Sequence, residues 1–442
     1  MHCNFSKYSM TFADYPWPND PSFIYPHRDQ LRDYLLGYVK QFDLLKYFKL
    51  NCRVDSVIQF DDLKWKIKWT DLIKNSKHEQ VFDFIIVASG LLSKPNIPKV
   101  KNKQEFQGVV MHSNDFKTND LRLKDKRVLV VGSSNSSAEI ASDLVGHAKS
   151  VINVFRRPFW VIPKFIQTKS VNNKEIYVPR DFLLYTRKFA YSNESTYEKY
   201  TQICPKQACK NSCPPDLYID SNCGQSANFG ISENYLKLVI ANEIEIKKGD
   251  MKQFVSNGIQ LEDGTIVEAD VILYCTGYKL EIPFFSQDLL DKIDYENDTY
   301  KNSIILYKHT FHPSLPNLGF VFLNRGLNFV GLDLQSKWIA AVFSGRIENP
   351  KIEDMQKEIG VNRLKGKNMN SAGKFSHDFY VKVIDELAKE LESYPNYDEE
   401  SKDKFENFLV TASHFTYNEN KQASLINIEQ IKNLTCYGCE RD

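Results

Sequence analysis

The sequence has no long apolar run and almost no imbalance of charge. No stretch approaches the roughly 20 apolar residues that cross a bilayer, and the N-terminus, MHCNFSKYSM, has no apolar secretory core. The 57 basic residues balance 56 acidic ones, which argues against a nucleic-acid groove or an anionic membrane surface. We therefore expect a cytoplasmic protein with no membrane span and no nucleic-acid partner. Its nine cysteines are expected to be reduced.

Zinc knuckles and catalytic triads are also missing. The four cysteines from Cys204 to Cys223 lack paired C-x₂-C spacing, so we expect no metal there and interpret the region as an excursion between strands. Cys436 and Cys439 have redox spacing but lie in a polar tail without a following βαβ unit. With no recognisable Ser–His–Asp set or carboxylate pair, any difficult chemistry falls to a cofactor.

The length and the aromatic content point to an enzyme or binding protein of more than one domain. A chain of 442 residues exceeds the usual size of one core, which predicts two or three domains. Its 29 Phe, 23 Tyr and 5 Trp residues suit a protein with sizeable apolar pockets.

Two matching segments indicate an internal repeat. DFIIVASG, Asp83–Gly90, and DVILYCTG, Asp270–Gly277, each join an acidic residue to a short apolar run and a small-residue–Gly turn. Each apolar run predicts a buried parallel strand. Alternating segments that predict β-hairpins precede both. The pair favours two related nucleotide-binding domains of α/β class, over the alternative of two unrelated buried strands.

The second domain opens with VLVVGSSNSSAEIASDL, a strand, a polar turn and a helix from Val128 onward. Gly132 keeps the first glycine of a dinucleotide-binding turn, whereas Ser134 and Ser137 occupy the second and third positions. Because backbone N–H groups and the helix dipole still face the turn, an anion site can persist.

The following strand selects between NAD and NADP. SVINVF, Ser150–Phe155, is predicted to be this strand, and Arg156 and Arg157 follow it. Arginine at this position accommodates the 2′-phosphate of NADP, where an acidic residue would favour NAD. We therefore predict NADP; the alternative is that both arginines are solvated strand-end charges.

The first domain shows only its closing strand. Nothing before Asp83 resembles a strand followed by G-x-G-x-x-G, so the chain is expected to begin inside this domain. A start codon assigned too far downstream would give the same pattern.

At this point the sequence resembles the flavin-containing monooxygenases. FQGVVMHSNDF fits the family fingerprint F-x-G-x-x-x-H-x-x-x-[YF] at Phe106, Gly108, His112 and Phe116. Further similar segments, in order, are CNFSKYSMTFADYPWP, FDLLKYFKLN, ASGLLSKPNIP, CTGYKLEIPF and LQSKWIAAVFSG. Related Baeyer–Villiger enzymes usually carry Trp where Phe116 stands, so the simple monooxygenase branch fits better.

The resemblance implies two Rossmann-like dinucleotide-binding domains, with the NADP domain inserted into an N-terminally incomplete FAD domain. Residues 1–118 and 282–442 would form the FAD domain, and residues 119–281 the NADP domain. NADPH would reduce FAD, O₂ would add to the flavin as a C4a-hydroperoxide, and a small lipophilic amine or sulfide would take the distal oxygen, as in N,N-dimethylaniline monooxygenases. The alternative is a non-catalytic relative that binds NADP but not FAD.

The resemblance also implies the site residues. Asn4 would lie beside flavin and nicotinamide and stabilise the hydroperoxide, and His112 would position the linker between the domains. Arg157, with Arg156, would hold the 2′-phosphate, and Gln335 would lie on a late helix near the flavin. The remaining expected cofactor contacts are Ser89, Gly90, Gly132, Ser134, Asn135, Ser136, Ser137, Ala138, Glu139, Thr276, Gly277 and Tyr278.

Overall fold

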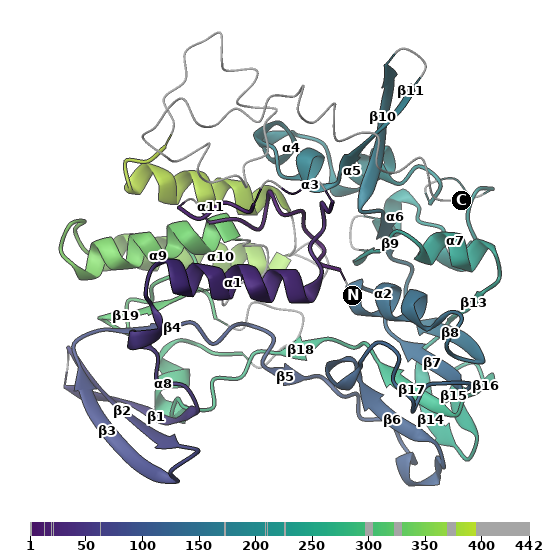
Figure 1. Ribbon diagram of the computed structural model, residues 1–442, viewed down its shortest axis with the longest axis horizontal. Helices are drawn as coiled ribbons and strands as arrows, with labels where there is room; N and C mark the ends of the chain where they lie inside the picture. Colours follow the sequence, from purple (N-terminus) through teal and green to yellow (C-terminus); the bar gives the residue numbers. More distant parts are fainter. Residues whose placement is uncertain are drawn as a thin grey trace.

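The computed structural model describes residues 2–394, apart from 13, 19, 21, 62, 172–173, 208, 210, 225–226, 297–303, 322–328 and 369–376. Figure 1 shows a helical and meander-containing part on the left and a parallel sheet with its covering helices on the right. Cys436 and Cys439 lie outside the described residues.

A five-stranded parallel sheet forms the centre of the right-hand part. Its order is β13–β8–β7–β17–β6, with strands β6 (Val109–His112), β7 (Arg127–Val131), β8 (Ser150–Phe155), β13 (Ile244–Lys248) and β17 (Val271–Tyr274). The predicted strand at Ser150–Phe155 is therefore confirmed. All four residues of β17 are buried, because this strand has a neighbour on each edge and layers on both faces.

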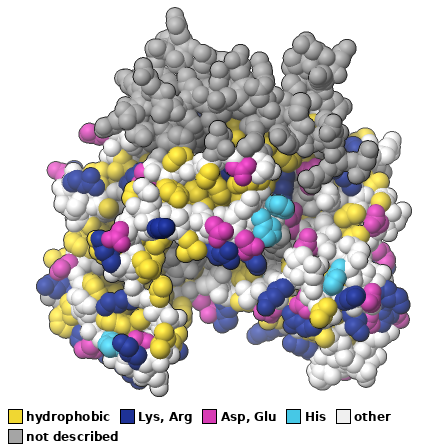
Figure 2. Space-filling model, in the orientation of Figure 1, with side chains coloured by type: hydrophobic (Ala, Val, Ile, Leu, Met, Phe, Trp, Pro, Cys, Tyr) yellow, Lys and Arg dark blue, Asp and Glu magenta, His cyan; other side chains and the backbone are white. Residues whose placement is uncertain are grey.

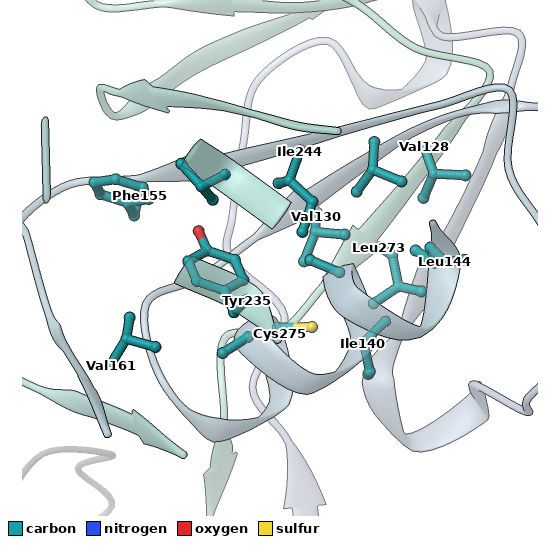
Figure 3. Packing of buried hydrophobic residues seen from close by; sticks show 14 of the residues in the cluster. Val128, Val130, Ile140, Leu144, Phe155, Val161, Tyr235, Ile244, Leu273 and Cys275 are labelled. Carbon is teal, nitrogen blue, oxygen red and sulfur yellow. The ribbon is translucent and has the colours of Figure 1, made fainter. Parts of the chain in front are cut away.

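Helices cover one face of this sheet and a small antiparallel sheet covers the other. Valines and leucines of the strands pack against Ile140 and Leu144 of helix α2 (Asn135–Leu144) (Figure 3). Helix α7 (Tyr235–Ile240) joins this layer. On the opposite face, Phe254 and Ile259 pack beneath Leu129 and Ile272. They belong to the antiparallel sheet β14 (Met251–Val255), β15 (Gly258–Leu261) and β16 (Ile266–Glu268).

The left-hand part repeats this arrangement of a meander followed by a parallel strand. Strands β1 (Cys52–Asp61), β2 (Lys64–Asp71) and β3 (Ser76–Phe82) form an antiparallel sheet, and β4 (Ile85–Val87) pairs in parallel with β19 (Leu318–Phe320). Both predicted hairpins thus occur within three-stranded meanders. Among the described residues β4 pairs only with β19, and its Ile86 is 48% exposed. The predicted parallel strand is confirmed, but it is buried only at Ile85 and Val87.

Helices complete the left-hand part (Figure 1). They are α1 (Arg28–Gln41), η1 (Leu45–Tyr47), α8 (Gln287–Lys292), α9 (Phe329–Phe343), α10 (Ile352–Asn368) and α11 (His377–Glu390). Helix α11 packs its apolar face on α9, with Ile384 and Leu387 fully buried beside Trp338. Exposed hydrophobic side chains, among them Leu45 and Ile73, lie on this part of the molecule (Figure 2). No helix within the described ranges is long and apolar enough to cross a bilayer.

An excursion between β8 and β13 joins the two parts. Its elements are β9 (Trp160–Ile162), β10 (Phe165–Val171), β11 (Lys174–Pro179), α3 (Asp181–Leu184), α4 (Arg187–Tyr191), α5 (Thr196–Ile203), η4 (Pro215–Leu217), α6 (Ser221–Gly224) and β12 (Phe229–Ile231). Strands β9 and β12 pair in parallel beside α2, whereas α4 packs against α11. Cys204 and Cys213 are free and buried, and no described cluster of His, Cys, Asp and Glu is placed to hold a metal.

Short elements complete the connections. Strands β5 (Lys94–Pro95) and β18 (Tyr278–Lys279) pair antiparallel where the chain crosses between the parts. The 3₁₀ turns η2 (Lys103–Glu105) and η3 (Ser113–Asp115) flank β6. Strand β6 lies before residue 119, where the sequence predicts that the NADP domain begins, yet it is the edge strand of the five-stranded sheet.

Candidate dinucleotide site

The turn between β7 and α2 is built around Gly132. Its φ is +150°, and a Cβ on this residue would lie 2.4 Å from the carbonyl oxygen of Cys275. The turn is held by the buried Asn153 side chain, whose Nδ2 donates to the carbonyls of Val130 (2.9 Å) and Gly132 (3.1 Å). Only glycine allows β7 to leave the sheet this close to the end of β17.

The two serines that replace the expected glycines point into the protein. Ser134 Oγ donates to the carbonyl of Phe229 at 2.9 Å, and Ser137 Oγ accepts from the Ser134 N–H at 2.9 Å. Asn135 Oδ1 accepts from the N–H of Ile231 at 2.8 Å. These side chains attach the start of α2 to β12, so an anion at this turn would be bound by backbone N–H groups of the first helical turn.

The other predicted residues of α2 divide by burial. Ser136 is half-buried at the helix start, whereas Ala138 is fully buried in the core and contributes packing. Glu139 pairs with Lys164 Nζ at 3.4 Å, and burial raises the pKa of this carboxyl. No motif in the sequence identified Lys164 as a site residue, yet it places a positive charge beside α2 from the excursion.

Arg156 and Arg157 are exposed immediately after β8. Their strand is the neighbour of β7 in the sheet, so both arginines lie at the same carboxyl edge as Gly132. Arg156 Nη1 lies 3.8 Å from an Asp250 carboxylate oxygen. Exposed arginines at this edge, together with the glycine turn and the helix start, fit the phosphate groups of NADP.

His112 holds the turn that follows β17. Its Nδ1 accepts from the N–H of Asn114 at 3.1 Å, which leaves the proton on Nε2, and Nε2 donates to the carbonyl of Gly277 at 3.0 Å. The ring is 2% exposed and meets Tyr278 edge to face. Burial lowers the pKa of His112, which favours the neutral imidazole that these two hydrogen bonds require.

The connection between the two parts meets the same turn. Asn96 N–H donates to the carbonyl of Gly277 at 2.9 Å, and Thr276 Oγ1 donates to the carbonyl of Asn96 at 2.5 Å. Asn96 Nδ2 in turn donates a hydrogen bond to the Thr276 carbonyl at 3.2 Å. The structure therefore brings Thr276, Gly277 and Tyr278 together with His112, and adds Asn96, a residue that the sequence analysis did not single out.

The predicted flavin residues lie in the other part. Ser89 is exposed and Gly90 has a φ of +76° after β4, while Asn4 is half-buried in the N-terminal segment. Gln335 is fully buried, and its Nε2 donates to the carbonyl of His309 at 2.8 Å and to Thr310 Oγ1 at 3.1 Å. Described residues place no counterpart of β7, Gly132 and α2 beside β4, so they fit FAD only in part.

A parallel sheet with a glycine turn, a helix start and strand-end arginines defines a dinucleotide-binding α/β protein. Residues 1–401 match the family model of flavin-binding monooxygenase-like proteins. The chain is 30% identical over 412 residues to human flavin-containing monooxygenase 3, covering 89% of this chain and 73% of that protein. It is 28% identical over 416 residues to rat dimethylaniline monooxygenase [N-oxide-forming] 2, with the same coverage.

The chain belongs to the flavin-binding monooxygenase-like family, whose cofactors are FAD and NADPH. Solved structures share its fold. S-allyl-L-cysteine S-oxygenase from Allium sativum matches at a TM-score of 0.61 and 21% identity, covering 98% of this chain and 83% of that chain. Cyclohexanone monooxygenase from Rhodococcus sp. Phi1, bound to NADP⁺, matches at 0.60 and 16%, covering 88% of each.

Proposed function

We propose that this protein is an NADPH- and FAD-dependent monooxygenase that oxygenates a nitrogen or sulfur atom of a small lipophilic substrate. Family membership over residues 1–401 carries the reaction class. The amine class is supported by the name of the rat relative, an N-oxide-forming dimethylaniline monooxygenase, and the sulfide class by the S-oxygenase of Allium sativum. When bound, the flavin supplies oxygen activation, and O₂ is the co-substrate.

The chain's own residues would bind and orient the cofactors. Arg157, helped by Arg156, would hold the 2′-phosphate, and the start of α2 would hold the pyrophosphate. His112 and Asn96 fix the Gly277 turn at the junction of the two parts. Asn4 would offer the reacting centre an uncharged amide that both donates and accepts hydrogen bonds.

A second candidate is a relative that binds NADP without FAD. The exposure of Ile86 on β4 favours it, since a further strand and helix, arranged as β7 and α2 are beside β17, would cover this residue. The NADP-binding residues are the same in both candidates, so binding of NADP does not distinguish them.

The visible spectrum of the purified protein separates the two. After incubation with FAD and removal of free cofactor, the monooxygenase retains flavin that absorbs at about 450 nm. It then oxidises NADPH and converts N,N-dimethylaniline to its N-oxide or methyl phenyl sulfide to its sulfoxide. A folded, colourless protein that binds NADP⁺ would establish the second candidate and overturn the first.

A further inference from the structure

Residues 4–10, the N-terminal segment, are held by one turn of the excursion. Arg180 Nη2 donates to the carbonyl oxygen of Asn4 at 2.5 Å. One oxygen of Asp181 accepts from the Ser6 N–H at 3.0 Å and from Ser6 Oγ at 2.5 Å, and it also accepts from Ser9 Oγ. Consecutive residues of the excursion thus bind three residues some 170 positions earlier in the chain.

Aromatic contacts extend this attachment along the same two segments. The Phe5 ring lies 5.5 Å from the Tyr185 ring, and the Tyr8 ring lies 5.5 Å from the Phe182 ring. The Arg180 guanidinium lies 5.3 Å from the centre of the Phe5 ring. The attachment therefore combines apolar packing with the hydrogen bonds to Asn4, Ser6 and Ser9.

The polar groups of this attachment are removed from water. Arg180, Asp181, Ser6 and Ser9 are all fully buried. A buried carboxylate is stable only when donors surround it, and hydrogen bonds to it are stronger than those between neutral groups. Asp181 therefore restricts the backbone of residues 6–9, and Arg180 restricts that of Asn4.

We propose that Arg180 and Asp181 are positioning residues for Asn4, which they fix from the excursion of the NADP-binding part. The inference rests on the proposed function for the role of Asn4, whereas the attachment itself stands on the contacts above. If this attachment is loosened, Asn4 would sample several positions. Transfer of oxygen to the substrate would then be slower than release of H₂O₂. Each uncoupled turnover then reduces O₂ with the two electrons of one NADPH, taking up one further proton and releasing H₂O₂ instead of oxygenated product and water.

A buried ion pair between the excursion and helix α11 offers a matched control. Asp385 of α11 accepts from Arg187 Nε at 3.0 Å and Arg187 Nη2 at 2.5 Å, and from Tyr191 OH at 3.2 Å. Its side chain is 3% exposed. Asp385→Asn removes a buried carboxylate that binds the same excursion, so it reproduces the structural cost of Asp181→Asn without touching those bonds to the N-terminal segment.

Two measurements on the full chain test the proposal. The first is backbone hydrogen exchange by mass spectrometry, in the presence of NADP⁺. Asp181→Asn is expected to speed exchange in residues 4–10 by about tenfold or more. The second is the ratio of H₂O₂ released to product formed per NADPH in the FAD-loaded protein. Asp181→Asn should raise this ratio, whereas Asp385→Asn should lower thermal stability and leave the ratio unchanged.

Arg180→Lys provides a second variant, since it keeps the charge and one donor nitrogen. It should change both the exchange rate of residues 4–10 and the ratio of H₂O₂ to product, but by less than Asp181→Asn. Unchanged exchange in residues 4–10, or an equal rise of the ratio in Asp385→Asn, would overturn the proposal. Absence of any oxygenated product from the unmodified protein would overturn the proposed function instead, and the exchange measurement would still decide whether Asp181 fixes the segment.

Discussion

The neutral imidazole of His112 donates a 3.0 Å hydrogen bond to the carbonyl oxygen of Gly277. His112 ends the edge strand β6, and Gly277 follows the neighbouring strand β17. The fingerprint histidine therefore acts on the small-residue–Gly turn of the second repeat, 165 positions away in the chain. It links the fingerprint to the turn of the second repeat at the carboxyl edge of the sheet.

Replacement of His112 by Phe should weaken NADP⁺ binding. The variant loses the bond to Gly277 and leaves the Asn114 N–H without its acceptor, at a cost of about 1–3 kcal/mol of unfolding free energy. Isothermal titration with NADP⁺ and urea unfolding measure the two effects. His147→Phe, which removes a 2.9 Å bond to the Asp120 carbonyl beyond the other end of α2, should lower stability alone. Equal losses of NADP⁺ affinity in both variants would contradict a specific role for His112.

Gly132→Ala should damage both stability and NADP⁺ binding. The added Cβ would lie 2.4 Å from the Cys275 carbonyl, which forces β7 and β17 apart and costs about 3 kcal/mol or more. Gly146→Ala is the control, because its φ is +80° but its Cβ would meet nothing within 4 Å. That variant should lose only about 1–2 kcal/mol and bind NADP⁺ normally. Urea unfolding and cofactor titration compare them, and similar losses would show that contact with Cys275 is unimportant.

Arg157→Gln should discriminate between the two nicotinamide cofactors. Loss of a charge-assisted hydrogen bond to the 2′-phosphate is expected to weaken NADPH binding by roughly tenfold to a hundredfold. NADH lacks that phosphate, so its affinity should stay the same. Parallel titrations with both cofactors measure this, with Arg156→Gln as the companion variant. An equal effect on NADPH and NADH would place the arginine's contribution elsewhere.

Acid should destabilise the protein through buried histidines of the left-hand part. Burial lowers the pKa of His312 to about 4, against about 6.5 in an unfolded chain. Asp294 and Arg363 act on this pKa in opposite directions. Above pH 6.5 both states hold the neutral ring. Between pH 6.5 and about 4, His312 binds a proton in the unfolded state but not in the native state. The free energy of unfolding therefore falls as the pH falls. Burial lowers the pKa of His309 to about 4 as well.

Urea unfolding at pH 7.5 and 5 measures this loss. His312→Asn keeps an acceptor for the Ser314 N–H, which His312 Nδ1 now binds at 3.2 Å, and it should lose less stability on acidification. His78→Asn, on the exposed strand β3, should behave as the unmodified protein. The same pH dependence in all three proteins would show that His312 does not contribute to it.

Individual strands and the glycine turn after β7 could be predicted from local pattern. Continuous β-branched runs such as SVINVF specify buried parallel strands, because both of their faces must be apolar. Gly132 marks the turn through the absence of a side chain. The fingerprint from Phe106 to Phe116 indicated the family, which the match over residues 1–401 confirms.

The roles of individual side chains depended on contacts between distant segments. In the sequence, Ser134 and Ser137 resemble weakened cofactor contacts. The structure shows instead that Ser134 attaches α2 to Phe229 of β12 and that Ser137 caps the helix start. No sequence motif singles out Arg180 and Asp181. Their importance comes from burial against Asn4, Ser6 and Ser9.

The sequence by itself therefore determined the class of fold, the family and the glycine turn between β7 and α2. Periodicity and glycine placement are local properties of a chain, so they can be recognised in a single sequence. The tertiary structure alone decided which polar side chains bind one another, since a hydrogen bond needs two groups within about 3 Å. The sequence does not show which side chains come within hydrogen-bonding distance when their segments are some 170 residues apart in the chain.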